Sequence, residues 1–474
     1  MKRLFVIPAA LLAAGLLTGC ATGPDYRRPE LALPETWRLE AAGTNTLADL
    51  PWASLYRDPV LSGLITEALT NNLDVRIAVA RIDEAIAAYR IQRADLLPAL
   101  NGSGRYTKAR VGNLPPLPGA EAEQFDFFGV LSYELDVWGR IRRLNEAAKA
   151  RYLATEEAAE VVRVSLVAGV ASTYFQLRSL DRQVEIAEAT LVSRSNSLEL
   201  TRIKFDDGNG IVSELDVAQA LTQVASTKSS IASLRRAVAV TENALAVLVG
   251  GAPRTMPRGW SIDAQWGPDD VPAGLPSDLL LRRPDLRAAE QQLIAANADI
   301  GAARAAYFPS ISLTGALGVQ SEEFDDLFDT GLSRAWNITP SITAPIFNGG
   351  KIRAGVRVAE ARQRTALATY EQAIQTAFRE VEDALIGIQY LREQLAADDE
   401  VVAAERHRLD LAYLRYEGGV ASYSDVLDAQ RFLFNAELAA VQTRNDLLNA
   451  TVQLYKALGG GPVEVTGPEP VYSP

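Results

Sequence analysis

Two proline-free stretches of 67 residues restrict the fold of this chain most strongly: Arg140–Asp206 and Lys351–Glu417. At ~1.5 Å per residue, each would form a helix of roughly 100 Å, which is far longer than the helices of globular proteins. Helices of this length are typical of coiled coils. The sequence supports that prediction with two series of mostly apolar residues that step alternately by four and three positions: Ile374, Phe378, Val381, Leu385, Ile388, Arg392 and Leu395, then Phe434, Leu438, Val441, Asn445, Leu448, Val452 and Tyr455.

The two stretches belong to an internal duplication, since they begin 211 positions apart. The same offset relates Pro98 to Pro309, and "GRIR" at Gly139 to "GKIR" at Gly350. Near the ends of the copies, "VGGAP" matches "LGGGP" at an offset of 209. A period this long excludes a solenoid and indicates two copies of one large unit. We expect repeat units at 61–252 and 281–460, a linker rich in Pro, Gly and Trp at 253–280, and flanking segments at 20–60 and 461–474.

Each unit is predicted to run helix, strand, strand, helix, helix. In the first unit the expected elements are a helix at Leu61–Leu96, strands at about 99–108 and 125–137, and helices at 140–206 and 211–249. In the second they are a helix at Pro284–Tyr307, strands at about 310–319 and 336–347, and helices at 351–417 and 424–458.

The four predicted strands alternate between apolar and polar residues. In "SISLTGALGV" Ile311, Leu313 and Leu317 fall on one face, and Ser312 and Thr314 on the other. A half-buried antiparallel sheet has this pattern, and so does a strand with lipid on one side and water on the other. Past the N-terminus we expect no stretch long and apolar enough for a transmembrane helix, so any crossing would use strands. Four strands cannot close into a pore; two copies would pool eight and three would pool twelve.

The N-terminus reads as a signal peptide, residues 1–19, with Lys2 and Arg3 before a short apolar run. It ends Leu17-Thr18-Gly19-Cys20, which resembles the lipobox of bacterial lipoproteins. The resemblance implies that Cys20, the only cysteine, becomes the first mature residue and carries diacylglycerol and an N-acyl chain such as palmitate. Ala21, in place of an aspartate, favours the outer membrane.

Composition and motifs exclude several functions. Asp and Glu outnumber Lys and Arg by 59 to 47, giving a net charge of −12, which argues against nucleic-acid binding. "NGGKIRAG" lacks the order of a phosphate-binding loop, because Ile352 follows Lys351. His407, the only histidine, lies among charged residues and is interpreted as a solvated helix residue. We expect neither an enzyme nor a cofactor other than the lipid on Cys20.

Together these features resemble the outer membrane factors, and more narrowly the lipoprotein efflux ducts of the TolC, OprM and NodT type. The motifs that carry the resemblance are "GCATGPDYRRP", "RAAYFPSISLTG", "APIFNGGKIRAG", "SYSDVLDAQR" and "LYKALGGG". The resemblance implies a homotrimer whose twelve-stranded β-barrel, four strands per protomer, continues into a coiled-coil periplasmic tunnel with a small mixed equatorial region. It also implies a periplasmic adaptor (membrane fusion protein) and an inner-membrane pump of the resistance-nodulation-division type as partners. The cargo stays open: drugs and solvents, metal ions or polypeptides.

The same resemblance places a periplasmic gate at "YEGGVASYSDVLDAQR". Asp425 and Asp428 would form aspartate rings, with Arg431 as a partner one turn on. Glu214, which lies 211 positions before Asp425, and Tyr416 would join the links that hold the closed state. Acidic residues in a first helical turn also complement the helix dipole without any further role. The family's lock uses an arginine where this chain has Ala421.

A competing interpretation is a lipid-anchored periplasmic coiled-coil adaptor or scaffold that does not span the membrane. The alternating strands and the duplication argue against it. Heat-modifiable trimers in outer-membrane fractions would distinguish the two.

Overall fold

The computed structural model describes residues 21–30, 36–39, 52–110, 121–207, 212–265, 279–329, 331 and 333–461. Cys20, the signal peptide and the tail from Pro462 onward therefore lie outside the described residues. The main elements are α2 (Trp52–Leu55), α3 (Pro59–Asn71), α4 (Leu73–Ala94), β1 (Ala99–Arg110), β2 (Glu121–Leu135), α5 (Arg140–Asp206), α6 (Glu214–Leu248), α7 (Leu279–Arg282), α8 (Pro284–Ala305), β3 (Ser310–Ser321), β4 (Arg334–Thr343), α9 (Lys351–Glu417) and α10 (Tyr423–Ala457).

The chain divides into two compact units, each of which takes segments from both sequence repeats. The first, here called the sheet unit, comprises residues 1–30, 81–156 and 288–372. The second, the helical unit, comprises 31–80, 157–287 and 373–474. The long helices α5 and α9 each contribute to both units. The compact units therefore cut across the duplicated segments.

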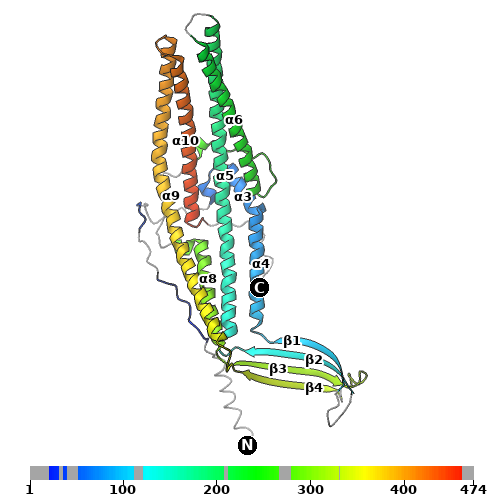
Figure 1. The fold of residues 1–474 in the computed structure, drawn as a ribbon. Helices are drawn as coiled ribbons and strands as arrows, with labels where there is room; N and C mark the ends of the chain where they lie inside the picture. Colours follow the sequence, from blue (N-terminus) through cyan, green and yellow to red (C-terminus); the bar gives the residue numbers. More distant parts are fainter. Residues whose placement is uncertain are drawn as a thin grey trace. The chain divides into compact units, whose positions relative to one another are not determined.

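The sheet unit contains one antiparallel sheet in the order β1-β2-β3-β4 (Figure 1). β2 ends at Leu135, before the expected 137, because the Asp136 carboxylate accepts the Ile141 and Arg142 amides (2.9 and 2.8 Å) and starts α5. β4 covers Arg334–Thr343 rather than 336–347. Pro345 beyond it has no N–H to donate to a ladder.

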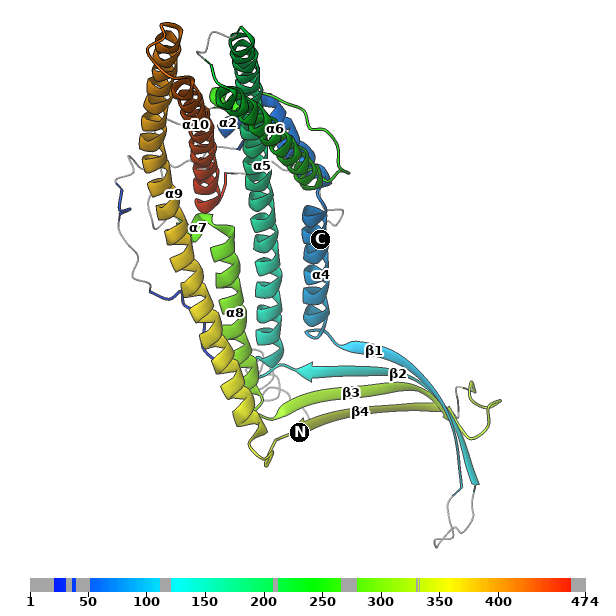
Figure 2. The same ribbon diagram turned by 45° about the horizontal axis from the view of Figure 1, so that its top comes forward.

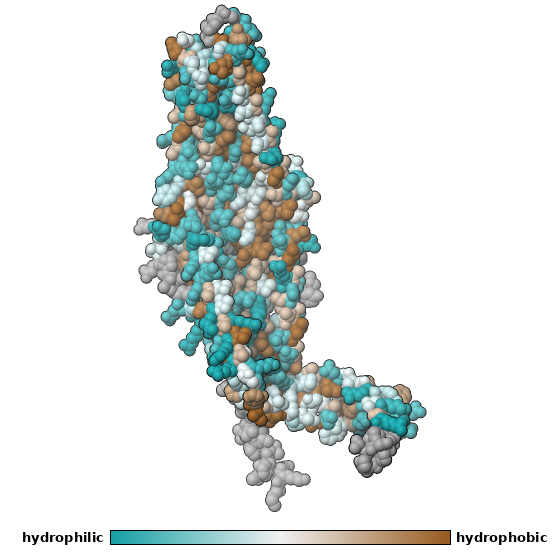
Figure 3. Space-filling view, in the orientation of Figure 1, coloured by the Kyte–Doolittle hydropathy of each residue, from teal (hydrophilic) through white to brown (hydrophobic). Residues whose placement is uncertain are grey.

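One face of this sheet is apolar and no helix of the sheet unit covers it (Figures 1 and 2). The register aligns Leu100, Leu131, Gly315 and Ile338 in one row across the four strands. Five large apolar side chains on this face are 66 to 74% exposed: Leu100, Leu317, Trp336, Ile338 and Ile342. In the space-filling view the strands show apolar residues at the surface beside polar ones (Figure 3). An open apolar face of this kind needs a lipid or a protein partner.

The opposite face of the sheet carries mostly polar and small residues, with Phe128 and Val130 of β2 among them. Ser312 lies opposite Ser341, with 2.7 Å between the two hydroxyl oxygens, and Thr314 lies opposite Thr339. This division of the two faces matches the alternation in the sequence.

In the helical unit, α9 and α10 form one helical hairpin, and α5 and α6 form another (Figure 1). Val381, Leu385, Val441 and Val452 of the heptad pattern are buried. Thr443 on α10 bonds to the Asp398 carboxylate on α9 (2.7 Å). The apolar seam therefore holds the second hairpin together, with polar bonds beside it.

The helix expected at Leu61–Leu96 is broken at Asn72, which is a correction to the prediction. Asn72 has extended backbone (ψ 134°), and its side-chain oxygen accepts the Asp74 amide at 2.7 Å, so it caps α4. Its Nδ2 donates to the carbonyl of Leu248 at the end of α6 (2.9 Å). Consequently α4 begins where α6 ends. In the same way Arg283, just before α8, donates to the carbonyl of Ala457 at the end of α10 (2.8 Å).

Two further observations differ from expectation. α5 contains an 18-residue window apolar enough, by length and composition alone, to cross a membrane. Half of that window is buried inside the protein, which is typical of a core helix. A small equatorial region of mixed helix and strand was also expected. Within the described residues, the segments that flank the repeat units contain only helical elements, including α2 and a 3-10 helix at Ile262–Ala264, and all strands belong to the single sheet.

Candidate functional site: the helical tip

The turn between α9 and α10 is built from two glycines. Gly419 has a positive φ of 73°, a backbone conformation that glycine adopts without strain. The Val420 amide then bonds to the Arg415 carbonyl (3.0 Å), which closes the end of α9. The second helix starts only three residues later, so the tip is compact.

Ser422 and Asp425 cap the start of α10. Their side chains form a capping box, in which the Asp425 carboxylate accepts the Ser422 amide at 3.2 Å. Asp425 therefore has a structural role whether or not it belongs to a gate. It is exposed, while its neighbours Val426 and Leu427 are buried.

Asp428 lies on the same exposed face and pairs with Arg431 at 2.9 Å. Both side chains are about half exposed (54% for Asp428 and 51% for Arg431), so within one chain the pair is weak. The Arg431 guanidinium also lies 5.2 Å from the centre of the Phe432 ring. The structure thus brings Asp428 and Arg431 together, and leaves the Asp425 and Asp428 carboxylates facing outward.

Tyr416 and Glu214, the residues predicted to hold the closed state, lie in different surroundings. Tyr416 lies with its ring 4.4 Å from the Lys204 ammonium and 5.3 Å from the Tyr423 ring. Burial, and then the charge of Asp216, raise the pKa of the Tyr416 hydroxyl. Glu214 is exposed at the first position of α6, and no described contact joins it to Tyr416.

Asp216, rather than Glu214, occupies the position equivalent to Asp425. Ser213 and Asp216 form a capping box at the start of α6, as Ser422 and Asp425 do at the start of α10. The sequence held a signal for this, because the two Ser-x-x-Asp motifs are 209 positions apart, like the glycine-rich ends of the two copies. The offset of 211, which relates earlier parts of the two copies, pairs Asp425 with Glu214 instead. Lys204 and Asp216 were not predicted.

Close to the tip, the two hairpins are packed together by an apolar cluster. Leu198 of α5 and Val224 of α6 contact Tyr423 and Val426 of α10. Beside the cluster, the Gln430 amide donates to the Tyr413 hydroxyl (2.5 Å). The second hairpin therefore cannot move away from the first without exposing this cluster.

Arg194 is buried among the same helices and is 4% exposed. It donates to the Thr227 hydroxyl at 2.7 Å, and its guanidinium lies 5.4 Å from the Phe434 ring centre. Burial lowers the pKa of Arg194. This cation joins α5, α6 and α10 and adds to the link between the hairpins.

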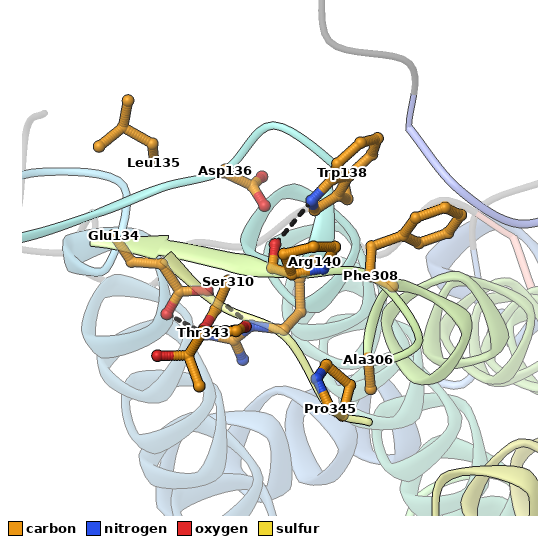
Figure 4. A pocket seen from close by; sticks show the side chains of 12 residues that line it. Glu134, Leu135, Asp136, Trp138, Arg140, Ala306, Phe308, Ser310, Thr343 and Pro345 are labelled. Atoms are coloured by element: carbon orange, nitrogen blue, oxygen red, sulfur yellow. Dashed lines mark hydrogen bonds and ion pairs between the residues drawn. The ribbon is translucent and has the colours of Figure 1, made fainter. Parts of the chain in front are cut away.

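The described residues offer no group of three or more His, Cys, Asp or Glu side chains that would hold a metal. The sheet unit has a cavity of about 280 Å³ where the strands meet the helices (Figure 4). Its walls include the Glu134–Arg140 ion pair (2.8 Å) and the stacked rings of Trp138 and Phe308, 4.6 Å apart. These features do not form an acid–base or nucleophile arrangement.

Long helical hairpins, a four-stranded sheet with an open apolar face and a capped acidic tip define a channel-type outer-membrane protein. The chain belongs to the outer membrane efflux protein family, whose model matches residues 64–251 and again 275–460. Its relatives are outer-membrane channels, so the adaptor interpretation is not supported.

Curated relatives and solved structures agree. The solvent efflux pump outer membrane protein SrpC of Pseudomonas putida is 43% identical over 461 residues, covering 95% of this chain and 97% of that protein. The cation efflux system protein CusC of Escherichia coli is 40% identical over 454 residues, covering 94% and 96%. A membrane protein of Pseudomonas aeruginosa superposes with a TM-score of 0.87 at 39% identity, covering 93% of this chain and 100% of that one. The open-state MtrE channel of Neisseria gonorrhoeae superposes with a TM-score of 0.84 at 36% identity, covering 93% and 98%.

Proposed function

We propose that this outer-membrane efflux channel works as a passive homotrimeric exit duct, docked to a periplasmic adaptor and an inner-membrane pump of the resistance-nodulation-division type. The main support for this proposal is the four-stranded sheet. Its apolar face is open, and β1 and β4 are edges whose backbone groups need partners inside a bilayer. Three copies pool twelve strands, enough for a barrel with an open lumen.

The lipid on Cys20 is part of this proposal. Diacylglycerol and an N-acyl chain would anchor the mature N-terminus to the outer membrane. The lipobox-like sequence at Leu17–Cys20 supports it.

The pump, rather than the duct, selects the cargo. The printed names of the relatives include both solvent and cation efflux. A duct architecture that serves such different cargoes discriminates weakly, so we assign this chain no selective cargo site.

The gate of the duct is the helical tip. Threefold symmetry would bring three copies of Asp425 and of Asp428 toward one axis, where like charges repel and attract cations. The contact of Tyr416 with Lys204 and the nearby charge of Asp216 support a role for Tyr416 in holding the closed state, in a chain that has Ala421 instead of an arginine. Glu214 would join the links between helices that hold the closed state. An adaptor that binds the open arrangement better would shift the hairpins outward.

The experiment is single-channel conductance in planar bilayers, after the mass of the detergent-extracted oligomer has been measured. In the presence of divalent cations, the double variant Asp425→Asn with Asp428→Asn should conduct several-fold more than the unaltered channel, because the ring carboxylates that bind the blocking cations are removed. Glu322→Gln with Glu323→Gln, an equal charge change between β3 and β4, is the control. Unchanged conductance and block in the double variant would refute the gate, and a monomer without channels would refute the duct.

A further inference from the structure

The first described residues of the chain are bound tightly to the sheet unit. Thr22 lies where β2 passes into α5: its amide donates to the Trp138 carbonyl (3.0 Å). Its hydroxyl oxygen lies 3.0 Å from that carbonyl and 3.0 Å from the carbonyl of Gly301 on α8. The Arg143 guanidinium donates in turn to the Thr22 carbonyl (3.2 Å). Thr22 is therefore held from three sides.

Three glycines make this close approach possible. A Cβ on Gly301 would lie 2.5 Å from the Thr22 carbonyl oxygen, and a Cβ on Gly139 would lie 2.8 Å from the Cα of Ala21. Gly23 has a φ of +98° and passes so near Gly301 that a Cβ would lie 2.4 Å from its Cα. We call the surface formed by Trp138, Gly139, Arg143 and Gly301 the notch. The backbone of residues 21–23 fits closely into the notch, and a side chain at Gly139 or Gly301 would collide with it.

The hold continues along the next residues. Asn297 donates to the Pro24 carbonyl (2.9 Å), and Arg143 pairs with Asp25 (2.7 Å). Glu290, 8% exposed, then accepts from Tyr26 (2.9 Å) and from two nitrogens of Arg28 (2.7 and 2.6 Å). Burial, and the bond to Glu290, raise the pKa of Tyr26. Contacts from Thr22 to Arg28 thus fix the segment on α8 and α5.

The notch lies at the end of the sheet where its strands meet the helices. Trp138 connects β2 to α5, and its indole stacks on Phe308, just before β3 (Figure 4). Ile346 and Phe347, which follow β4 at the same end, are 98% and 91% exposed. Aromatic and apolar side chains gathered at the ends of spanning strands are typical of a membrane–water interface.

We propose that Ala21–Glu30 is a rigid anchor segment, latched in the notch, that fixes the lipid of Cys20 at the depth where the strands end. Cys20 precedes Thr22 by two residues, a reach of at most about 7 Å. The segment then acts as a spacer of fixed length rather than a loose tether, and it aligns the edge strands of neighbouring copies at one depth during assembly. This inference rests on the proposed lipidation of Cys20.

The first test lengthens the chain between Cys20 and the notch. Six residues, Gly-Ser-Gly-Ser-Gly-Ser, inserted after Ala21 keep Ala21 beside the cysteine and add up to about 20 Å. The last serine of the insert then takes the place of Ala21 beside Gly139, and the contacts of Thr22 to Arg28 are kept. We expect the fraction of heat-resistant trimer in outer membranes to fall several-fold. The matched control carries the same insertion after Glu30, beyond the latch, and should assemble as the unaltered protein does. Equal assembly of all three proteins, or an equal loss with both insertions, would overturn the depth-setting role.

The second test opens the latch itself. Trypsin cleaves after Arg27 but not between Arg28 and Pro29, so cleavage at Arg27 in open outer-membrane fragments reports release of the segment. Gly301→Ala should accelerate this cleavage about tenfold or more, because the bonds of Thr22 are lost. Gly355→Ala, a helical glycine of the same unit with no atom near its Cβ position, should not. Equal cleavage in Gly301→Ala and the unaltered protein would refute the latch.

A third variant separates the latch from the lipid. In Cys20→Ser the segment should stay resistant to trypsin, because protein contacts hold it. Rapid cleavage there would mean that the lipid holds the segment, which contradicts the inference. Mass spectrometry of the N-terminal peptide of the unaltered protein tests lipidation independently: an unmodified Cys20 would overturn the anchor, while the trypsin result would still report on the latch.

Discussion

At the scale of single residues, Asp58 shows how a buried charge organises the helical unit. Its carboxylate is 1% exposed and accepts from the Tyr174 hydroxyl (2.8 Å), the Gln265 amide (2.8 Å) and the backbone amides of Val60 and Trp260 (2.9 Å each). Burial opposes ionisation, but these hydrogen bonds outweigh it and lower the pKa of Asp58. One carboxylate thereby joins α3, α5 and the start of the linker.

Asp58→Asn should destabilise the protein by about 1–3 kcal/mol, because an amide nitrogen would face groups that donate. Since the folded pKa lies below the ordinary value, the contribution of Asp58 is present above about pH 4 and is lost as pH falls below that value. Denaturation of the two proteins in detergent between pH 7 and pH 3 measures the loss of stability in the variant and its dependence on pH. A variant as stable as the unaltered protein at pH 7 would contradict this prediction.

Lys204 is the residue whose loss best tests the closed tip. Its contact with the Tyr416 ring contributes about 0.5–1 kcal/mol per protomer, and three copies act together. Lys204→Gln should therefore raise the open probability in planar bilayers several-fold. Lys228→Gln, an exposed change of equal charge on α6, serves as the control and should behave as the unaltered channel does. Identical open probabilities for all three would remove Lys204 from the closed state.

At the scale of elements, the sheet depends on close contact between β2 and β3. Gly318 of β3 packs against β2 so tightly that a Cβ would lie 2.0 Å from the Phe127 carbonyl oxygen and 2.7 Å from the Phe128 Cα. At Gly129 of β2 the nearest atom, the Leu317 carbonyl oxygen, would lie at an ordinary 3.7 Å. A side chain would therefore clash at Gly318 but would fit at Gly129.

Gly318→Ala should cost about 1–3 kcal/mol through overpacking and lower the temperature at which the trimer dissociates. Gly129→Ala should leave that temperature nearly unchanged. Heat-modifiability on gels measures both variants under the same conditions. Equal shifts would mean that the spacing of β2 and β3 does not limit the barrel.

At the scale of the whole molecule, a formal charge of −12 and the acidic tip predict a cation-preferring channel. Reversal potentials under a salt gradient should show this preference, and it should weaken as ionic strength rises because the exposed charges are screened. The double variant of Asp425 and Asp428 should be less selective. An anion preference at low salt would contradict the prediction.

The sequence by itself determined the local elements, because their signals are local. The proline-free stretches lie in α5 and α9, each of 67 residues, and the alternating residues lie in the four strands. The family resemblance placed the acidic tip at the motif that holds Asp425 and Asp428, and this motif starts α10. Periodicity and capping act over a few residues, so they can be read without knowing the fold.

Only the tertiary structure decided the features that join distant residues. Helix-like sequence runs through Asn72, yet the helix breaks there because the Asn72 side chain caps α4 and also bonds to Leu248, 176 positions away. The notch forms where Thr22 meets Gly301, 279 positions away, and the Tyr416 ring lies beside Lys204 of another helix. Such partners depend on how long helices pack against one another, and no local pattern encodes that packing.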